Sequence, residues 1–321
     1  MARFADYTPG GVIPATLLAF HDDLSIDDAG TRRHLRFVAA TRGISAITVN
    51  GHSSEIHACS FDEQRAILAA ALDEVGDAVP LINGVYADGS LEAAHIAAMA
   101  AGEGASALLV FPPQSMTTGG RLRPEMAVEH FRRIAGATDL PLIAFQYSAA
   151  SGLGYPLDTL LAIKDAVPTL KAIKDWSADP FLHEQHIRTL QALPDPVTVL
   201  STHSGWLMAS LSMGAGGVLS GAGSVVADLQ VALFEAIQAN DLATARAVND
   251  RLYPVQQAFY AAPFLDMHNR MKECLVMLGR LDRAVVRPPL MKLPAAELAR
   301  LRAALDAAGL GRDGALPLAA E

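Results

Sequence analysis

The stretch LKAIKDW at residues 170–176 is the sixth of eight short apolar runs that recur along this chain. Runs of this kind are typical of buried parallel strands, and a helical pattern follows each of them. The eight runs are GVIPATLLAF (11–20), AITVN (46–50), PLINGVY (80–86), ALLVFPP (107–113), PLIAFQY (141–147), LKAIKDW (170–176), VTVLST (197–202) and GGVLSGAG (216–223). Their spacing of roughly 25–35 residues is that of repeated strand–helix units. Eight such units predict an α/β fold of the (β/α)8, or TIM-barrel, type. An open doubly wound sheet would usually carry a Gly-rich loop after its first strand, and this sequence has none there.

The segments between the runs carry helix signals. Residues 61–76 begin with acidic residues and end at Gly76, as a helix would. Residues 90–104 predict a second helix, with Ser90 as its N-cap and Glu92 as early negative charge. Proline stands just before or at the start of three of the predicted strands, at positions 80, 141 and 196, where it breaks no ladder.

The chain divides into two predicted parts. Residues 1–238 form the barrel, and residues 239–321 form a C-terminal helical domain for which we expect no chemistry of its own. Within that domain the helical patterns are 241–262, 268–281 and 294–309, and residues 310–321 look like a frayed tail.

Composition limits the possible functions. The 321 residues are 51% hydrophobic and 18% charged, with a formal net charge of −9. An acidic chain without a basic cluster is a poor candidate for binding nucleic acid or anionic membranes. No apolar run is long enough to span a bilayer, and the first residues lack a signal-peptide pattern. Cys59 and Cys274 form neither a metal-like pair nor a disulfide framework, so we expect a cytoplasmic enzyme.

Lys174 is the out-of-place residue of the sixth run. Active sites of (β/α)8 barrels lie at the carboxyl ends of the strands, and a lysine in an apolar strand is costly unless its charge is paired or removed. Burial favours the neutral amine, which attacks a ketone or aldehyde to form a Schiff base. The alternatives are a lysine that reaches solvent from the strand end, or one in a structural ion pair with Asp175.

Tyr147 ends the preceding run, so its phenol can face Lys174 across the barrel mouth and move protons. It can equally be a rim aromatic with a satisfied hydroxyl. The second run leads into Gly51-His52-Ser53-Ser54-Glu55, a turn whose backbone N–H groups and Ser53 hydroxyl could hold a carboxylate. An ordinary turn that caps the next helix is the alternative.

Taken in order, these motifs resemble the dihydrodipicolinate synthase/N-acetylneuraminate lyase family of pyruvate-handling class I aldolases. The resemblance covers about residues 10–295. It rests on GVIPATLLAF, GHSSE in the place of a Gly-Thr-Thr-Gly-Glu-like turn, PLINGV, LLVFPP, FQYS, KAIKDWS, GAGGVLSG and a late RPP at 287–289.

The resemblance implies a role for each matching position. It implies Lys174 as the Schiff-base lysine and Tyr147 as the catalytic tyrosine. It places Ser53 and the backbone of Ser54 at the pyruvate carboxylate, and the backbone carbonyl of Leu219 facing the pyruvyl group. It further implies a homo-oligomer, dimer or tetramer, with no metal and no organic cofactor.

Two departures from the family pattern concern the second substrate. The synthase continues its tyrosine strand as Tyr-Asn-Val-Pro-x-Arg, whereas residues 147–152 read YSAASG and lack the carboxylate-gripping arginine. After the fourth strand the synthase has two tyrosines, one of which completes a proton relay from a neighbouring subunit. Residues 112–115 read PPQS instead. His52 replaces a threonine of the family turn and could supply an acid/base group or a hydroxyl contact.

Three functions remain possible from the sequence. The first is a Schiff-base-forming lyase, aldolase or hydro-lyase that acts on a 2-keto acid, pyruvate or pyruvate-derived, and is not a lysine-biosynthetic synthase. The second is a non-catalytic, keto-acid-binding member of the same fold. The third is a metal-dependent hydrolase that uses His52, His57 and His203, whose spacing is not that of a metal site. The sequence does not distinguish cleavage, condensation and dehydration.

Overall fold

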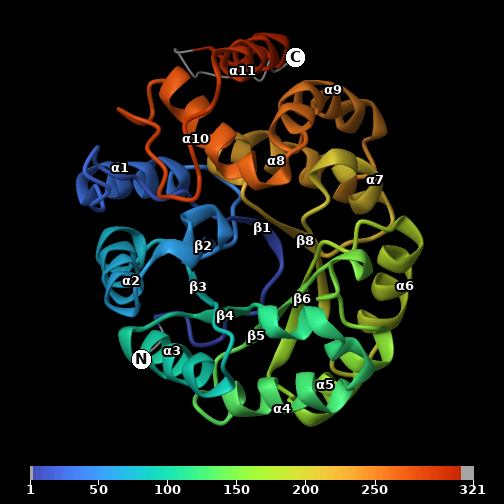
Figure 1. Cartoon of the computed structure of the whole chain (residues 1–321). Coiled ribbons are helices and arrows are strands. Elements are labelled where there is room, and N and C mark those ends of the chain that lie inside the picture. The colour runs from blue at the N-terminus through green and yellow to red at the C-terminus, as the bar shows by residue number, and fades with distance from the viewer. Residues whose placement is uncertain (1–2, 312–321) are drawn as a thin grey trace.

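Eight parallel strands form the centre of the computed structural model, which describes residues 3–311 (Figure 1). They are β1 (Gly11–Pro14), β2 (Ile47–Val49), β3 (Leu81–Val85), β4 (Ala107–Val110), β5 (Leu142–Gln146), β6 (Leu170–Asp175), β7 (Thr198–Ser201) and β8 (Gly217–Ser220). Each strand pairs with the next, and β8 pairs with β1. Parallel bridges from Val12 to Ile44 and from Ala15 to Thr48 join β1 to the β2 region. The predicted (β/α)8 barrel is confirmed.

A ring of helices surrounds the strands (Figure 1). It consists of α1 (Asp28–Ala39), α2 (Phe61–Val75), α3 (Ser90–Glu103), α4 (Pro124–Ala135), α5 (Leu157–Ala166), α6 (Pro180–Leu190), α7 (Leu207–Ser212) and α8 (Gly223–Gln238). Helix α2 begins as predicted, since Ser60 and Glu63 form a reciprocal capping box. The predicted N-cap at Ser90 is wrong. Gly89 holds that position, and the Ser90 hydroxyl lies 3.0 Å from Nδ1 of His130 on α4.

Strand alternation sorts the core into two layers. On β5 and β6, Ile143, Phe145 and Ala172 belong to the cluster inside the barrel, whereas Ala144 and Ile173 belong to the layer between barrel and helices. The same alternation directs the side chain of Lys174 into the barrel and the side chain of Asp175 toward the helices. The strands are shorter than the apolar runs because each run continues past the ladder into the loop at the barrel mouth.

Three further helices follow the barrel, namely α9 (Leu242–Phe259), α10 (Met267–Met277) and α11 (Ala295–Ala307). Helix α9 packs on α8 and α11, and α10 contacts α8, α9 and α11. The predicted helical ranges differ from these bounds by a few residues at their ends. The division into domains at residue 238 stays a prediction. Most of the predicted tail lies outside the described residues. Among the described residues, no helix combines the length and apolarity that crossing a bilayer requires.

Candidate active site

Lys174 lies inside the barrel near the carboxyl end of β6. Its side chain is 6% exposed, and its Nζ atom lies 4.1 Å from the centroid of the Phe145 ring. Within residues 3–311, no carboxylate lies within ion-pair distance of Nζ. Burial lowers the pKa of Lys174 from its ordinary value to about 7. The structure thus places an amine of weakened basicity, without a counter-ion, in the barrel mouth.

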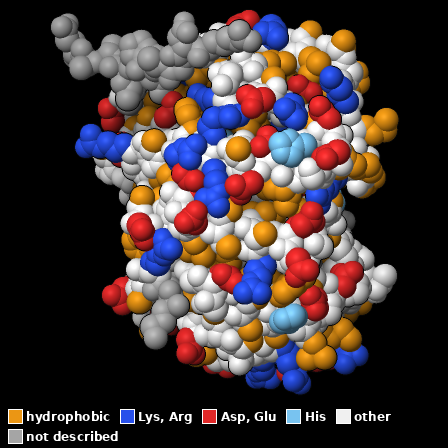
Figure 2. Space-filling model, turned by 90° about the vertical axis from the view of Figure 1, so that its left-hand side faces the viewer, with side chains coloured by type: hydrophobic (Ala, Val, Ile, Leu, Met, Phe, Trp, Pro, Cys, Tyr) orange, Lys and Arg blue, Asp and Glu red, His pale blue; other side chains and the backbone are white. Residues whose placement is uncertain are grey.

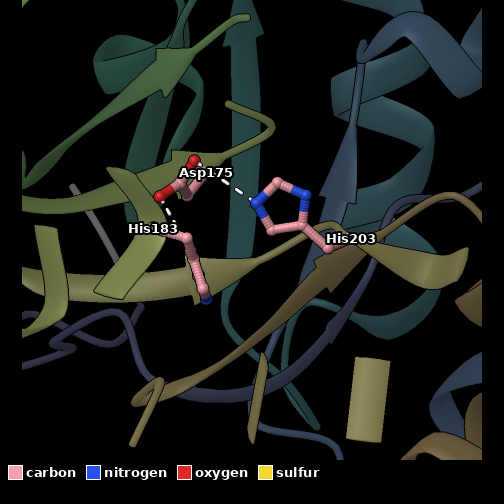
Figure 3. A group of neighbouring side chains, drawn as sticks. All are labelled: Asp175, His183 and His203. Carbon is pink, nitrogen blue, oxygen red and sulfur yellow. Dashed lines mark hydrogen bonds and ion pairs between the residues drawn. The ribbon is translucent and has the colours of Figure 1, made fainter. Parts of the chain in front are cut away.

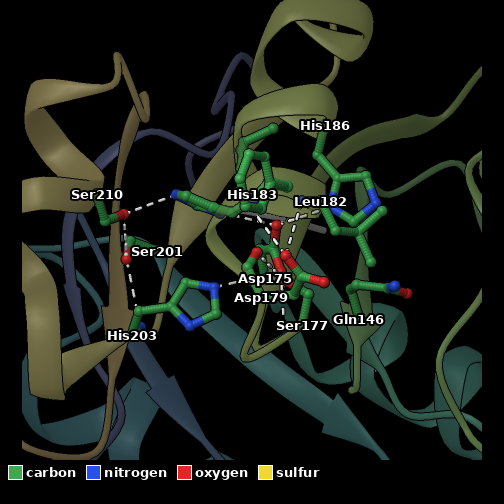
Figure 4. Close-up of polar contacts among 12 residues, drawn as sticks. Gln146, Asp175, Ser177, Asp179, Leu182, His183, His186, Ser201, His203 and Ser210 are labelled. Carbon is green, nitrogen blue, oxygen red and sulfur yellow. Dashed lines mark hydrogen bonds and ion pairs between the residues drawn. The ribbon is translucent and has the colours of Figure 1, made fainter. Parts of the chain in front are cut away.

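Asp175 does not pair with Lys174, which excludes the structural ion pair weighed above. Successive strand residues face opposite sides, so Asp175 points outward to α6. Its Oδ2 atom lies 2.8 Å from Nδ1 of both His183 and His186. Its Oδ1 accepts a hydrogen bond from the N–H of Ser177 and lies 3.5 Å from Nε2 of His203 (Figures 3 and 4).

This histidine–aspartate cluster contains metal-ligating residue types that sequence reasoning did not bring together. Candidate ligand atoms of Asp175, His183 and His203 lie within 4.8 Å of one another, and all three residues are buried. However, the spacings from Asp175 to His183 and His186 are those of hydrogen bonds. His183 also uses its second nitrogen, because Nε2 lies 2.7 Å from the Ser210 hydroxyl (Figure 4). Metal binding would therefore break at least one good hydrogen bond.

The metal set considered from the sequence is not brought together. His57 is exposed on the short helix Ile56–Ala58, His203 belongs to the cluster outside the barrel, and His52 lies at the barrel mouth. That hypothesis is wrong.

Tyr147 follows β5 by one residue and belongs to the cluster inside the barrel, although it is not among the residues that line the pocket around Lys174. Its ring centroid lies 4.4 Å from that of Phe145, the ring that Lys174 also contacts. Its hydroxyl oxygen lies 3.0 Å from Nε2 of His52 and 3.4 Å from Nδ1. Burial raises the pKa of Tyr147 far above its ordinary value, so the phenol stays protonated.

His52 stands among aromatic rings. The imidazole centroid lies 4.7 Å from the Phe111 ring, 5.7 Å from Phe145 and 6.0 Å from Tyr86. Burial, followed by the charge of Lys174, holds the pKa of His52 well below its usual range. The ring is therefore neutral at physiological pH, with one nitrogen that donates and one that accepts.

The turn after β2 provides one free polar group. The hydroxyl of Ser54 donates to the carbonyl of Thr16 at 2.8 Å, and its N–H donates to the carbonyl of Gly51 at 3.1 Å. The hydroxyl of Ser53 is buried and has no partner among the described residues. Since a buried hydroxyl without a partner costs free energy, Ser53 is suited to receive a ligand oxygen.

A buried ion pair anchors this turn to the C-terminal segment. Glu55, in a left-handed conformation with φ of 53°, ends the turn. Its Oε1 lies 2.5 Å from Nζ of Lys272 on α10, and its Oε2 accepts from the N–H of Arg287 at 2.9 Å. The position of the turn thus depends on residues more than 200 positions later in the chain.

The pocket around Lys174 corrects our expectation for the C-terminal segment. The side chains and backbone that line it come from both parts of the chain: His52, Phe145, Lys174, Trp176, Thr202, Gly221, Tyr260, Met267 and His268. Arg270 fixes the connection between α9 and α10 by donating to the carbonyls of residues 259, 261, 262 and 263. Because this connection lies beside the pocket, the segment expected to lack chemistry contributes three lining residues, Tyr260, Met267 and His268. No local sequence signal identified them.

Leu219 lies on β8 and is fully buried, with its side chain in the cluster inside the barrel. It is not among the residues that line the pocket, although Gly221, two positions later, is. The free volume between the lining groups is only about 30 Å³, room for one or two water molecules.

Comparisons with known proteins agree with this architecture. The model of the dihydrodipicolinate synthetase family matches residues 8–308. An uncharacterized DapA-like lyase of Halobacterium salinarum is 32% identical over 303 residues, which are 94% of each chain. A 4-hydroxy-tetrahydrodipicolinate synthase of Methanopyrus kandleri is 27% identical over 95% of this chain and 98% of its own.

Solved structures give the same fold. YagE, an Escherichia coli K12 prophage protein solved in complex with pyruvate, superposes with a TM-score of 0.86 at 24% identity, over 94% of this chain and 99% of its own. The barrel, the match over nearly the whole length and the identity to the DapA-like lyase together lead to one conclusion. This chain is a member of the dihydrodipicolinate synthetase family.

Proposed function

We propose that this protein is a Schiff-base-forming lyase, aldolase or hydro-lyase that acts on a 2-keto acid, pyruvate or a pyruvate-derived compound. The observation that carries the proposal is the buried Lys174 amine, which has no counter-ion and a pKa lowered to about 7. Above that pH most of the amine is neutral and nucleophilic. The names of the relatives, a DapA-like lyase and a synthase, are consistent with this class of chemistry.

The proposed reaction begins when Nζ of Lys174 attacks the keto carbon. The carbinolamine that forms then takes up one proton on its hydroxyl group and loses water to give a protonated imine. That imine accepts the electron pair of a neighbouring bond, so that a C–H or C–C bond at the adjacent carbon can break and leave an enamine. When the enamine is protonated, a new C–H bond forms at the same carbon. When the enamine attacks an aldehyde carbon, a new C–C bond forms there. Either step regenerates the protonated imine.

Tyr147 and His52 are suited to move the protons that these steps require. The phenol and the neutral imidazole are 3.0 Å apart at the closest pair of atoms, so a proton lost by one can pass to the other. Ser53, whose hydroxyl has no partner, is proposed to bind the keto-acid carboxylate with the backbone of its turn. The carbonyl of Leu219 is proposed to face the pyruvyl group. Because the pocket is small, lining side chains must move to admit the acid.

We do not propose lysine-biosynthetic synthase activity. Among the described residues, the lining of the pocket includes no arginine. Its one cationic side chain is Lys174, whose charge as a protonated imine is already balanced by the carboxylate of the bound keto acid. A second substrate with its own carboxylate would then be buried without a cation, which costs several kcal/mol.

Borohydride trapping tests the proposal. Protein incubated with pyruvate and reduced will gain the mass of the reduced adduct on a peptide that contains Lys174. Lys171 provides a matched control, since it lies on the same strand but pairs with Asp195 at 2.8 Å outside the barrel. Lys171→Ala will trap normally and Lys174→Ala will not. Failure to trap any 2-keto acid on Lys174 would refute the mechanism.

The alternative function is a non-catalytic, keto-acid-binding protein, motivated by the absence of the family's relay tyrosines at residues 112–115. The two functions differ in what binding requires. If Lys174→Ala binds pyruvate as tightly as the wild type in calorimetry, the imine is dispensable and the binding function is favoured.

A further inference from the structure

His268 is a pocket residue with a titratable side chain that the proposed chemistry does not use. It is the second residue of α10, and it lines the pocket opposite the barrel strands together with Met267 and Tyr260. Its position is fixed closely. A Cβ atom on Gly221 would lie 3.1 Å from both Cδ2 and Nε2 of the ring, so any larger residue there would push the imidazole by a few tenths of an ångström.

The polar atoms of His268 are available to a ligand. Within the described part of the chain, no hydrogen bond or ion pair engages its ring nitrogens, and the residue keeps partial exposure. Burial, with the charge of Lys174 as the second cause, lowers the pKa of His268 to about 3. His268 therefore presents one neutral N–H donor and one neutral acceptor to the pocket.

The rest of the lining has the same electrical character. His52 is neutral for the same reasons, and Thr202 and Tyr260 carry hydroxyls. Trp176 and Phe145 add apolar rings. The nearby cation Lys272 is already paired with Glu55. Once Lys174 holds the keto acid as a protonated imine, the carboxylate of that acid balances the charge, and the remaining donors and acceptors are neutral and lie between aromatic rings. Such a lining matches a hydroxyl or carbonyl oxygen and disfavours a carboxylate.

We infer that His268 is a specificity-determining residue, which with His52 binds an uncharged oxygen on the part of the substrate beyond the imine. The second substrate is accordingly an uncharged aldehyde, hydroxylated or aromatic, and not a carboxylated one. The inference rests on the proposed function, since it needs Lys174 to hold the keto-acid fragment in place.

The test compares aldehydes in condensation with pyruvate. Glycolaldehyde, glyceraldehyde and benzaldehyde represent the uncharged class, and glyoxylate and succinic semialdehyde carry a carboxylate. We expect the wild type to favour uncharged aldehydes at least about tenfold in kcat/KM. Loss of one or two neutral hydrogen bonds in His268→Phe will lower kcat/KM for the hydroxylated aldehydes by about five- to tenfold, chiefly through KM.

Two further variants keep the test decisive. The control is His95→Phe, which replaces an exposed histidine of α3 that does not line the pocket. This exchange will leave every rate unchanged. His268→Asn keeps a donor and an acceptor and will recover part of the loss. The rate of borohydride trapping with pyruvate, measured on each variant, reports whether the fold and the Lys174 site are intact.

The outcomes separate this inference from the proposed function. Absence of trapping in the wild type refutes the function itself. With trapping intact, a preference for carboxylated aldehydes, no turnover of any uncharged aldehyde, or unchanged kinetics in His268→Phe overturns the inference. If both His268 variants lose trapping, His268 serves the imine site, and its role in specificity is refuted.

Discussion

The amine of Lys174 differs from that of Lys171, the other lysine of β6, because it is buried and has no ion-pair partner among the described residues. Lys171, three residues earlier, faces outward and reaches Asp195. This difference follows from strand parity, because three residues reverse the face of a strand. It makes Lys174 costly for folding and useful for imine chemistry.

The cost of Lys174 predicts a pH-dependent stability. Its pKa is about 7 in the folded protein and 10.5 ordinarily, so the unfolded chain binds more protons between these values. The buried Lys174 therefore destabilises the folded protein fully below pH 7. This destabilisation falls as the pH rises to about 10.5, and it is absent above that pH. Lys174→Met will therefore stabilise the protein by roughly 2–5 kcal/mol near neutral pH. Urea unfolding across this pH range, with Lys171→Met as control, measures it. A gain that does not vary with pH would contradict this account.

Tyr147 predicts a loss of rate without loss of binding. In Tyr147→Phe the ring still packs on Phe145, but no proton can pass to His52, so kcat will fall about a hundredfold while KM for the keto acid stays similar. Tyr155→Phe is the matched control. Tyr155 belongs to the outer core layer, and its hydroxyl has no partner among the described residues. Equal effects of the two exchanges on kcat would show that Tyr147 moves no proton.

At the scale of elements, the turn after β2 is held in place by α10 through the pair of Glu55 and Lys272. Both side chains are buried, so removing one leaves an unpaired charge. Glu55→Gln will destabilise the protein by about 3–5 kcal/mol, and adding Lys272→Met will recover part of that loss. Equilibrium unfolding measures the series. Arg133→Met, which removes an exposed ion pair with Glu129 on α4, will cost less than about 1 kcal/mol.

The histidine–aspartate cluster joins β6 to α6 and to the loop after β7. We expect it to work as a hydrogen-bonded hub without a metal, since both nitrogens of His183 already have partners. Dialysis against a chelator, followed by addition of zinc, will leave Tm unchanged. Asp175→Asn will lower stability by roughly 2–4 kcal/mol, because the carboxylate accepts several hydrogen bonds in the buried cluster. Stoichiometric zinc in the purified protein would contradict this assignment.

At the scale of the whole molecule, the proposed proton path lies within one chain. Tyr147, His52 and Lys174 all belong to a single barrel, whereas the synthase pattern takes a relay tyrosine from a neighbouring subunit. We still expect a homo-oligomer, dimer or tetramer. Activity per chain will nevertheless stay constant when the protein is diluted until the oligomer dissociates. Sedimentation measured in parallel with the kinetic assay tests this expectation. Activity that falls in step with dissociation would mean that a neighbour completes the site.

The surface agrees with the partners expected from composition. Figure 2 shows basic and acidic side chains interleaved over the face that it presents, without a continuous basic area. On α1 and α2, for example, Arg32 contacts Asp28, Asp73 and Glu74. Because the charges alternate, this face has no continuous positive potential that would attract nucleic acid. Binding of a small keto acid does not require such a potential.

The amino-acid sequence by itself determined the repeated strand–helix units, the inward position of Lys174 and the nearness of Tyr147. These follow from local periodicities, since a strand alternates every two residues and parallel strands share one carboxyl edge. The cluster around Asp175 was within reach of the same reasoning, because Asp175 faces outward and His183 and His186 lie three apart on one helix face.

Only the tertiary structure decided what stands opposite Lys174. Gly221 lies against His268, Lys272 pairs with Glu55, and residues at both ends of the connection between α9 and α10 line the pocket. No periodicity encodes such contacts, because they depend on how a helical segment packs as a whole on α8 and the barrel. Local spacing therefore fixed the inward position of Lys174, whereas long-range packing fixed which residues of the C-terminal segment line the pocket opposite it.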